Sequence, residues 1–126
     1  MARLFWICLG GAAGTAARYL VALWSIKRFG PGFPLGTLIV NLTGCFLIAF
    51  VMETAVARSW PDTARLAVTV GFIGGFTTYS SFNFETTRLA QTGVTSAAFL
   101  YVLATLVGGL AAGILGMQVA RIVLNR

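Results

Sequence analysis

Charged side chains are scarce in this sequence of 126 residues, which contains nine Lys and Arg, three Asp and Glu and no His. Charged residues make up 10% of the chain, whereas a soluble domain carries roughly 25%. The absence of His removes the commonest metal ligand and the usual proton shuttle near neutral pH. The composition therefore excludes an ordinary water-soluble domain.

Cysteine is almost as scarce. Cys8 and Cys45 lie within apolar segments and form no C-x-x-C spacing, so we expect two buried packing residues rather than a redox or metal site. The basic residues are scattered singly, mostly near the ends of apolar segments. The net charge of +6 therefore indicates contacts with membrane-lipid headgroups and not with nucleic acid.

Apolar side chains are abundant, at 58% of residues and a mean hydropathy of +0.88. Because a helix needs about 20 apolar residues to cross a bilayer, the chain has room for about four spans and for no separate soluble domain. We predict an all-α integral membrane protein with four transmembrane helices and a single membrane domain, residues 1–126. The expected spans are residues 4–23, 35–57, 63–90 and 96–123.

Small residues recur in the first and last spans. Gly10 and Gly14 have the spacing G-x-x-x-G, and Gly109 and Gly113 repeat it. This spacing puts a flat stripe on one helix face, which predicts close helix packing.

The third span contains the most informative stretch, GFIGGFTTYSSFNFE, from Gly71 to Glu85. Irregular backbone at membrane depth survives only where protein buries it or where it lines a wet cavity, and such breaks often handle ions. The hydroxyl-rich run after the glycine pair predicts a helix that is irregular around Gly74 to Thr78 and restarts near Tyr79. Alternatively, the glycines only allow neighbouring helices to approach closely.

The second span carries polar side chains in its interior. Thr37 and Asn41 are four residues apart and share a helix face. The Asn41 amide offers donors and an acceptor, so it is a candidate site residue. The alternative is that Asn41 only joins two helices through a hydrogen bond.

The distribution of basic residues leaves the orientation in the membrane nearly undetermined. Arg3, Arg58, Arg65, Arg121 and Arg126 belong to one side of a four-span chain, and Arg18, Lys27, Arg28 and Arg88 belong to the other. This near balance predicts insertion in both directions and an antiparallel, dual-topology homodimer. A single orientation set by other features is the alternative.

Two blocks of residues resemble the CrcB/Fluc fluoride channels. They are GTLIVN from Gly36 to Asn41 and GFIGGFTTYSSF from Gly71 to Phe82, followed by Glu85, with Tyr101 in the last span. The resemblance covers nearly the whole chain. It implies an antiparallel dimer in the bacterial inner membrane, with two narrow fluoride pathways and a structural sodium ion at its centre. It also implies passive export of cytoplasmic fluoride, and therefore no enzymatic activity.

The resemblance also implies roles for individual residues. Backbone carbonyls of Gly74 and Thr77 would hold the sodium ion, and Arg18 would lie near a vestibule. Tyr79 and Phe82 would form an aromatic box, whose first position is usually Phe in the family. The residues expected along the fluoride pathway are Thr37, Asn41, Tyr79, Ser81, Phe82, Glu85, Tyr101 and Thr105.

Two other functions compete with the channel. A small four-helix proton-coupled multidrug exporter needs an acidic residue in its first span, and none is present there. A membrane assembly or scaffold subunit would explain the glycine stripes but not the polar run after Gly75. A hydrolase lacks support, because no His or Asp lies near the serines of the third span.

Overall fold

Every regular element in the part of the chain that the structure describes, residues 1–125, is helical. Arg126, which was counted in the charge balance, lies outside this part. The computed structural model arranges the helices as four rods, of which the third is built from four consecutive segments. Their bounds are α1 Ala2–Phe29, α2 Leu35–Ala57, α3 Asp62–Leu66, η1 Ala67–Ile73, α4 Gly74–Phe76, α5 Tyr79–Gln91 and α6 Thr95–Val123. The all-helical prediction with four rods is confirmed.

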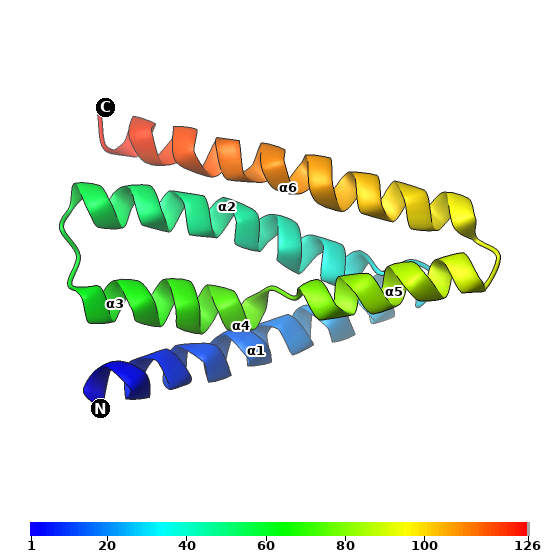
Figure 1. The fold of residues 1–126 in the computed structure, drawn as a ribbon, viewed down its shortest axis with the longest axis horizontal. Helices are drawn as coiled ribbons and strands as arrows, with labels where there is room; N and C mark the ends of the chain where they lie inside the picture. Colours follow the sequence, from blue (N-terminus) through cyan, green and yellow to red (C-terminus); the bar gives the residue numbers. More distant parts are fainter. Residues whose placement is uncertain (126) are drawn as a thin grey trace.

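Successive rods run in opposite directions and lie side by side (Figure 1). α2 packs along α6, and α1 packs against η1 and α4. The start of α1, the end of α6 and the turn between α2 and α3 lie at one end of the bundle, called the terminal end below (Figure 1). The turns after α1 and after α5 lie at the opposite end, called the loop end.

Among residues 1–125, three helices, α1, α2 and α6, are long and apolar enough to cross a membrane. α2 covers the residues expected for the second span, whereas α1 extends beyond residues 4–23 at both ends. At 1.5 Å per residue, α1 is about 42 Å long, so its ends reach beyond a hydrocarbon core of ~30 Å. Large apolar side chains stay exposed along the rods, as contact with lipid requires, among them Leu20, Leu106, Leu110 and Ile114.

The third rod is interrupted, but later than the sequence indicated. Gly74 and Gly75 continue the helix in α4, and Thr77 and Thr78 leave it for an extended backbone with ψ of 159° and 115°. The expectation of irregular backbone from Gly74 onward was therefore wrong at the glycines. α5 begins at Tyr79, where the helix was expected to restart. Ahead of the break, η1 has the wider winding of a π-helix, which often occurs near functional sites.

Glycines bring α1 and the third rod into backbone contact. A Cβ atom added to Gly14 would lie 2.9 Å from the backbone nitrogen of Phe76, and one added to Gly75 would lie 2.6 Å from the carbonyl oxygen of Gly11. Close helix approach, the alternative explanation for the glycine pair, therefore applies to Gly75. It does not apply to Gly74, because a Cβ atom added there would lie 3.8 Å from its nearest neighbour, the Thr69 carbonyl oxygen of the same rod.

Between α6 and α2 the close contact is made by Gly116 rather than by the predicted pair of glycines. A Cβ atom added to Gly116 would collide with the carbonyl oxygen of Phe46, whereas one added to Gly109 would lie 3.4 Å from the Cys45 sulfur and one added to Gly113 would lie 3.8 Å from the Cys45 carbonyl oxygen. Cys45 is half-buried in this contact, but Cys8 is exposed on α1. The expectation of two buried thiols was wrong for Cys8, because an outward position on a membrane helix is apolar without being covered by protein.

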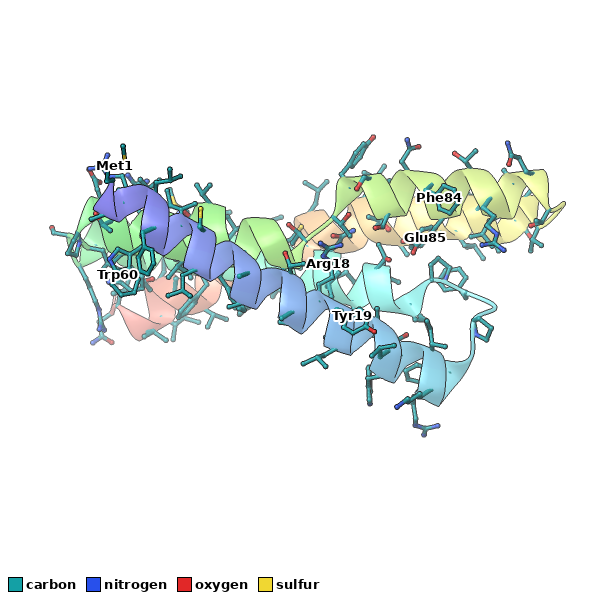
Figure 2. All side chains as sticks on the ribbon, turned by 90° about the horizontal axis from the view of Figure 1, so that it is seen from below. Met1, Arg18, Tyr19, Trp60, Phe84 and Glu85 are labelled. Atoms are coloured by element: carbon teal, nitrogen blue, oxygen red, sulfur yellow. The ribbon has the colours of Figure 1, made fainter. Side chains whose placement is uncertain are left out.

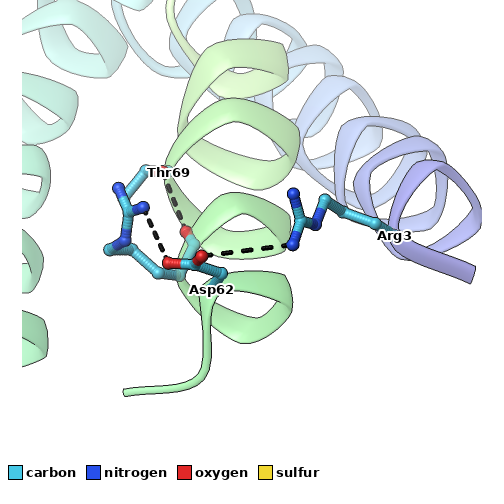
Figure 3. Close-up of polar contacts among 4 residues, drawn as sticks. Arg3, Asp62 and Thr69 are labelled. Carbon is cyan, nitrogen blue, oxygen red and sulfur yellow. Dashed lines mark hydrogen bonds and ion pairs between the residues drawn. The ribbon is translucent and has the colours of Figure 1, made fainter. Parts of the chain in front are cut away.

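Ion pairs join the rods at the terminal end. Asp62 of α3 lies 3.0 Å from Arg65 and 4.0 Å from Arg3 of α1 (Figure 3). Arg121 of α6 lies 3.0 Å from Glu53 of α2. Exposed pairs of this kind contribute about 0 to 1 kcal/mol each. Helix packing, rather than these pairs, therefore holds the bundle together.

The glycine contacts predict unequal effects of two neighbouring substitutions. Gly14→Ala should destabilise the bundle by about 1 to 3 kcal/mol, because its Cβ has no space against the backbone of Phe72 and Phe76. Gly11→Ala is the matched control, since its Cβ would lie 3.8 Å from the nearest atom and Ala favours a helix. Thermal unfolding in detergent, followed by size-exclusion chromatography, measures both. Equal midpoints for the two variants would contradict the packing described here.

Candidate functional site

The break in the third rod is held by one side chain of α2. The Asn41 amide nitrogen donates to the Thr78 carbonyl oxygen at 3.0 Å, and the Thr78 backbone N–H donates to the Asn41 side-chain oxygen at 2.8 Å. Asn41 thereby replaces the helical partners that the extended backbone has lost. This satisfies backbone groups that would be costly to leave unpaired at membrane depth.

Side chains close to the break satisfy further groups. The Thr78 hydroxyl accepts from the Ser81 backbone N–H at 3.2 Å and so caps α5. Arg18 of α1 donates from Nε to the Gly75 carbonyl oxygen at 3.1 Å, which places a cation at the C-terminal end of α4. Figure 2 shows Arg18 reaching from α1 toward the gap between the two halves of the third rod.

Three carbonyl groups of the break have no such partner. The carbonyl oxygens of Gly74, Phe76 and Thr77 accept no hydrogen bond among the residues that the structure describes. Of these three residues, Gly74 and Thr77 line an open groove of about 540 Å³ along α2 and α6. Oxygen atoms of this kind are ligands for hard cations. Residues 1–125 hold no group of three His, Cys, Asp or Glu side chains that could bind a metal instead.

The same groove contains an aromatic and a hydroxyl lining. Tyr79 is 78% exposed, and its ring lies 5.7 Å from the buried ring of Phe82. The Thr105 hydroxyl of α6 is buried and has no hydrogen-bond partner among the described residues. The groove is thus apolar over most of its length, with an unused hydroxyl and an exposed phenol beside the break. Its lining includes Asn41, Gly74, Thr77, Thr78, Tyr79, Phe82, Thr105 and Gly109.

Glu85 forms a second polar centre beside the break. Its carboxylate accepts from the Thr37 hydroxyl at 2.8 Å and from the Tyr101 hydroxyl at 2.8 Å. The Tyr101 ring is fully buried and meets the rings of Phe82 and Phe33 edge-on, at centroid distances of 5.2 Å and 5.4 Å. This cluster joins α2, α5 and α6 through charge-assisted hydrogen bonds.

A smaller hollow of about 270 Å³ joins the two centres on the side facing α1. Arg18, Thr37, Thr78, Ser81 and Glu85 all line it. The structure therefore gathers the predicted residues around one break, but on two faces. Thr37, Ser81, Glu85 and Arg18 lie on the α1 side, and Tyr79 and Thr105 lie on the open groove.

Sequence reasoning missed the partners of these residues. The Asn41–Thr78 bonds, the acceptor role of Glu85 and the Phe33 contact were not anticipated. Phe33 stands in the turn after α1, outside any periodic pattern that would assign it to a helix face. The bonds of Asn41 to Thr78 confirm that it joins α2 to the third rod, as the alternative supposed. Its expected role in a pathway remains a prediction.

An integral membrane bundle with a discontinuous helix and polar groups at the break has the architecture of ion channels and transporters. The chain matches the family model described as CrcB-like protein, Camphor Resistance (CrcB), over residues 5–117. The chain belongs to this family.

Curated relatives are similar over nearly their whole length. A protein named fluoride-specific ion channel FluC from Anaeromyxobacter dehalogenans is 51% identical over 113 residues, which covers 89% of this chain and 90% of the relative. The proteins of the same name from Sorangium cellulosum and Roseiflexus are 51% and 48% identical, over 96% and 92% of this chain and 96% and 94% of the relatives.

The bonds of Asn41 predict a stability effect that is independent of any transport assay. Asn41→Ala should lower stability by about 2 kcal/mol, because it leaves the half-buried N–H and carbonyl of Thr78 unpaired. Thr43→Ala is the matched control on the same helix, since Thr43 is exposed. Thermal unfolding in detergent distinguishes the two variants. An unchanged midpoint for Asn41→Ala would show that Asn41 does not hold the break.

Proposed function

We propose that this chain is the subunit of a fluoride-selective channel that passively exports fluoride. The observation that carries the proposal is the break at Thr77–Thr78, which gathers amide, hydroxyl and aromatic groups at one level of the bundle. The names of the relatives support it. Fluoride that accumulates in the cytoplasm would leave through the channel, driven by the membrane potential. The relatives are named as channels, in agreement with the expectation that the chain is not an enzyme.

The chemistry of the site suits a small, strongly hydrated anion. A pore for such an ion must replace its water with donors, yet must bind it weakly enough for release. The Asn41 amide has a second N–H beyond the one given to Thr78, and the Thr105 hydroxyl is unused among the described residues. The edge of the Phe82 ring carries partial positive charge. Tyr79 adds a phenolic hydroxyl where the family usually has Phe.

An antiparallel, dual-topology homodimer explains features that a single chain leaves open. Ser80, Asn83 and Thr87 are spaced three and four residues apart on α5, so they share a helix face. All three are exposed. Tyr79 beside them is 78% exposed. Polar groups at membrane depth are costly against lipid, so a second copy or water must cover them. The near balance of basic residues at the two ends supports antiparallel insertion.

The unused carbonyl oxygens of Gly74 and Thr77 fit a structural sodium ion. Two carbonyls per chain would give four oxygen ligands when two copies meet at the groove. The bound ion would neutralise the negative ends of these backbone dipoles and fix the two breaks against each other. The Thr77 side chain takes no part, because its hydroxyl donates to the Ile73 carbonyl oxygen at 3.0 Å.

We further propose the bacterial inner membrane as the location, since the relatives named above are bacterial. Lys27 and Arg28 lie exposed at the end of α1, where they can contact anionic lipid headgroups. The exporter alternative still lacks an acidic residue in α1. The scaffold alternative does not account for the polar groups gathered at the break.

The proposal predicts selective anion flux. Liposomes containing the purified protein, with valinomycin and potassium to balance charge, should release fluoride rapidly and chloride negligibly. Asn41→Asp should slow fluoride release at least about tenfold, an effect of about 1.4 kcal/mol, because it removes a donor and adds a negative charge. Phe82→Ile should also slow release, by removing the ring edge.

Matched variants separate these effects from general damage. Phe84→Ile on the same helix should conduct normally, because Phe84 is 66% exposed and lies outside the groove lining. Folded protein that releases neither ion would refute the channel. Equal release of fluoride and chloride would refute the selectivity.

The sodium proposal predicts dependence on a cation. Replacing sodium by N-methylglucamine should lower the thermal midpoint of the purified protein, because the carbonyls at the break would lose their ligand. Thr77→Ala should keep this dependence, since the proposed ligand is a backbone oxygen. A midpoint that is the same in both cations would refute a bound sodium ion while leaving the fluoride channel intact.

A further inference from the structure

A third hollow, of about 450 Å³, opens at the loop end of the bundle. The turn after α1, residues 31–34, forms one wall, and Arg88 and Thr92 of α5 form part of another. Thr37 and Glu85 line both this hollow and the smaller one that contains Arg18 and Ser81. The hollow at the loop end, called the mouth below, therefore leads through the Thr37–Glu85 pair to the break.

The charges along this route have opposite effects on an anion. The Glu85 carboxylate lines the inner part of the mouth and repels any anion that approaches the break. Arg88 stands three residues further along α5, so the two side chains share a helix face. Arg88 is exposed and forms no ion pair among residues 1–125. Within the described part of the chain, Arg88 is also the only basic side chain that lines the mouth.

We propose that Arg88 makes the mouth an anion-recruiting site that offsets the repulsion by Glu85. The site would take small monovalent inorganic anions of any identity, and would raise their local concentration without contacting them in the selective part of the pathway. A charged side chain in a low-dielectric hollow raises the local concentration and the entry rate of ions of the opposite sign, and salt screens the effect. The inference rests on the proposed channel function and adds an entry residue to it.

The loop end provides a matched control. Arg28 is exposed at the same end, but it does not line the mouth, and its guanidinium carbon lies 5.5 Å from the centre of the Phe29 ring. Replacing either arginine by Gln changes the net charge and the balance of basic residues equally. A difference between the two variants therefore reports position and not overall charge or orientation in the membrane.

The test measures initial fluoride efflux from liposomes of uncharged lipid at a constant fluoride concentration. Potassium gluconate sets the ionic strength to about 0.01 M or about 1 M, where the Debye length is ~30 Å or ~3 Å. At low ionic strength, Arg88→Gln should reduce efflux roughly threefold, the effect of one charge about 6 Å away in water. Arg88→Lys and Arg28→Gln should stay near the wild-type rate. At high ionic strength all rates should converge, with the fluoride-to-chloride ratio unchanged.

Three results would overturn the inference while the channel stands. They are wild-type efflux by Arg88→Gln at low ionic strength, an equal loss in Arg28→Gln, and a loss in Arg88→Gln that persists at high ionic strength. The last result would indicate a structural role for Arg88. Absence of fluoride efflux from the folded wild-type protein is a distinct outcome, which would refute the channel and this inference together.

Discussion

The bonds between Asn41 and Thr78 are the interaction on which the rest of the site depends. A helix that stops inside a bilayer leaves N–H and carbonyl groups without water to satisfy them. Asn41 replaces both lost partners of Thr78, and Arg18 takes the carbonyl of Gly75. The chain can therefore keep an irregular segment in the middle of a bundle. The groups that remain unpaired nearby are then available to ions.

Backbone contact between the rods provides the rigidity that such a site needs. Gly14 and Gly75 place α1 directly against the half of the third rod nearer the terminal end, so the end of α4 is fixed. On the other side of the break, the Glu85 carboxylate connects α5 to Thr37 of α2 and to Tyr101 of α6. The two halves of the rod are thus held by different neighbours. This arrangement keeps the break open to a groove on one side and to a hollow on the other.

Much of the site was predictable in kind, and little of it in detail. The polar run after Gly75 indicated a break because hydroxyl side chains are rare in lipid contact, and α5 does begin at Tyr79. The break begins later than predicted, at Thr77, because Gly75 stays helical and lets α1 approach closely. The low helix propensity of glycine does not reveal such a contact. The bonds of Glu85 and the Phe33 ring could not be predicted, since they join residues from four separate segments of the chain.

The sequence alone indicated that the protein lies in a lipid bilayer, that it has four rods and that the third rod contains the irregular segment. Those properties follow from composition and spacing, which are local and additive along the chain. The tertiary structure decided which polar groups are used within the chain and which remain free, because that depends on distances between segments far apart in sequence. Asn41 illustrates the difference. Its residue type and position predicted a polar group inside the bundle, but only the packing of α2 against the break showed that its hydrogen-bond partner is Thr78.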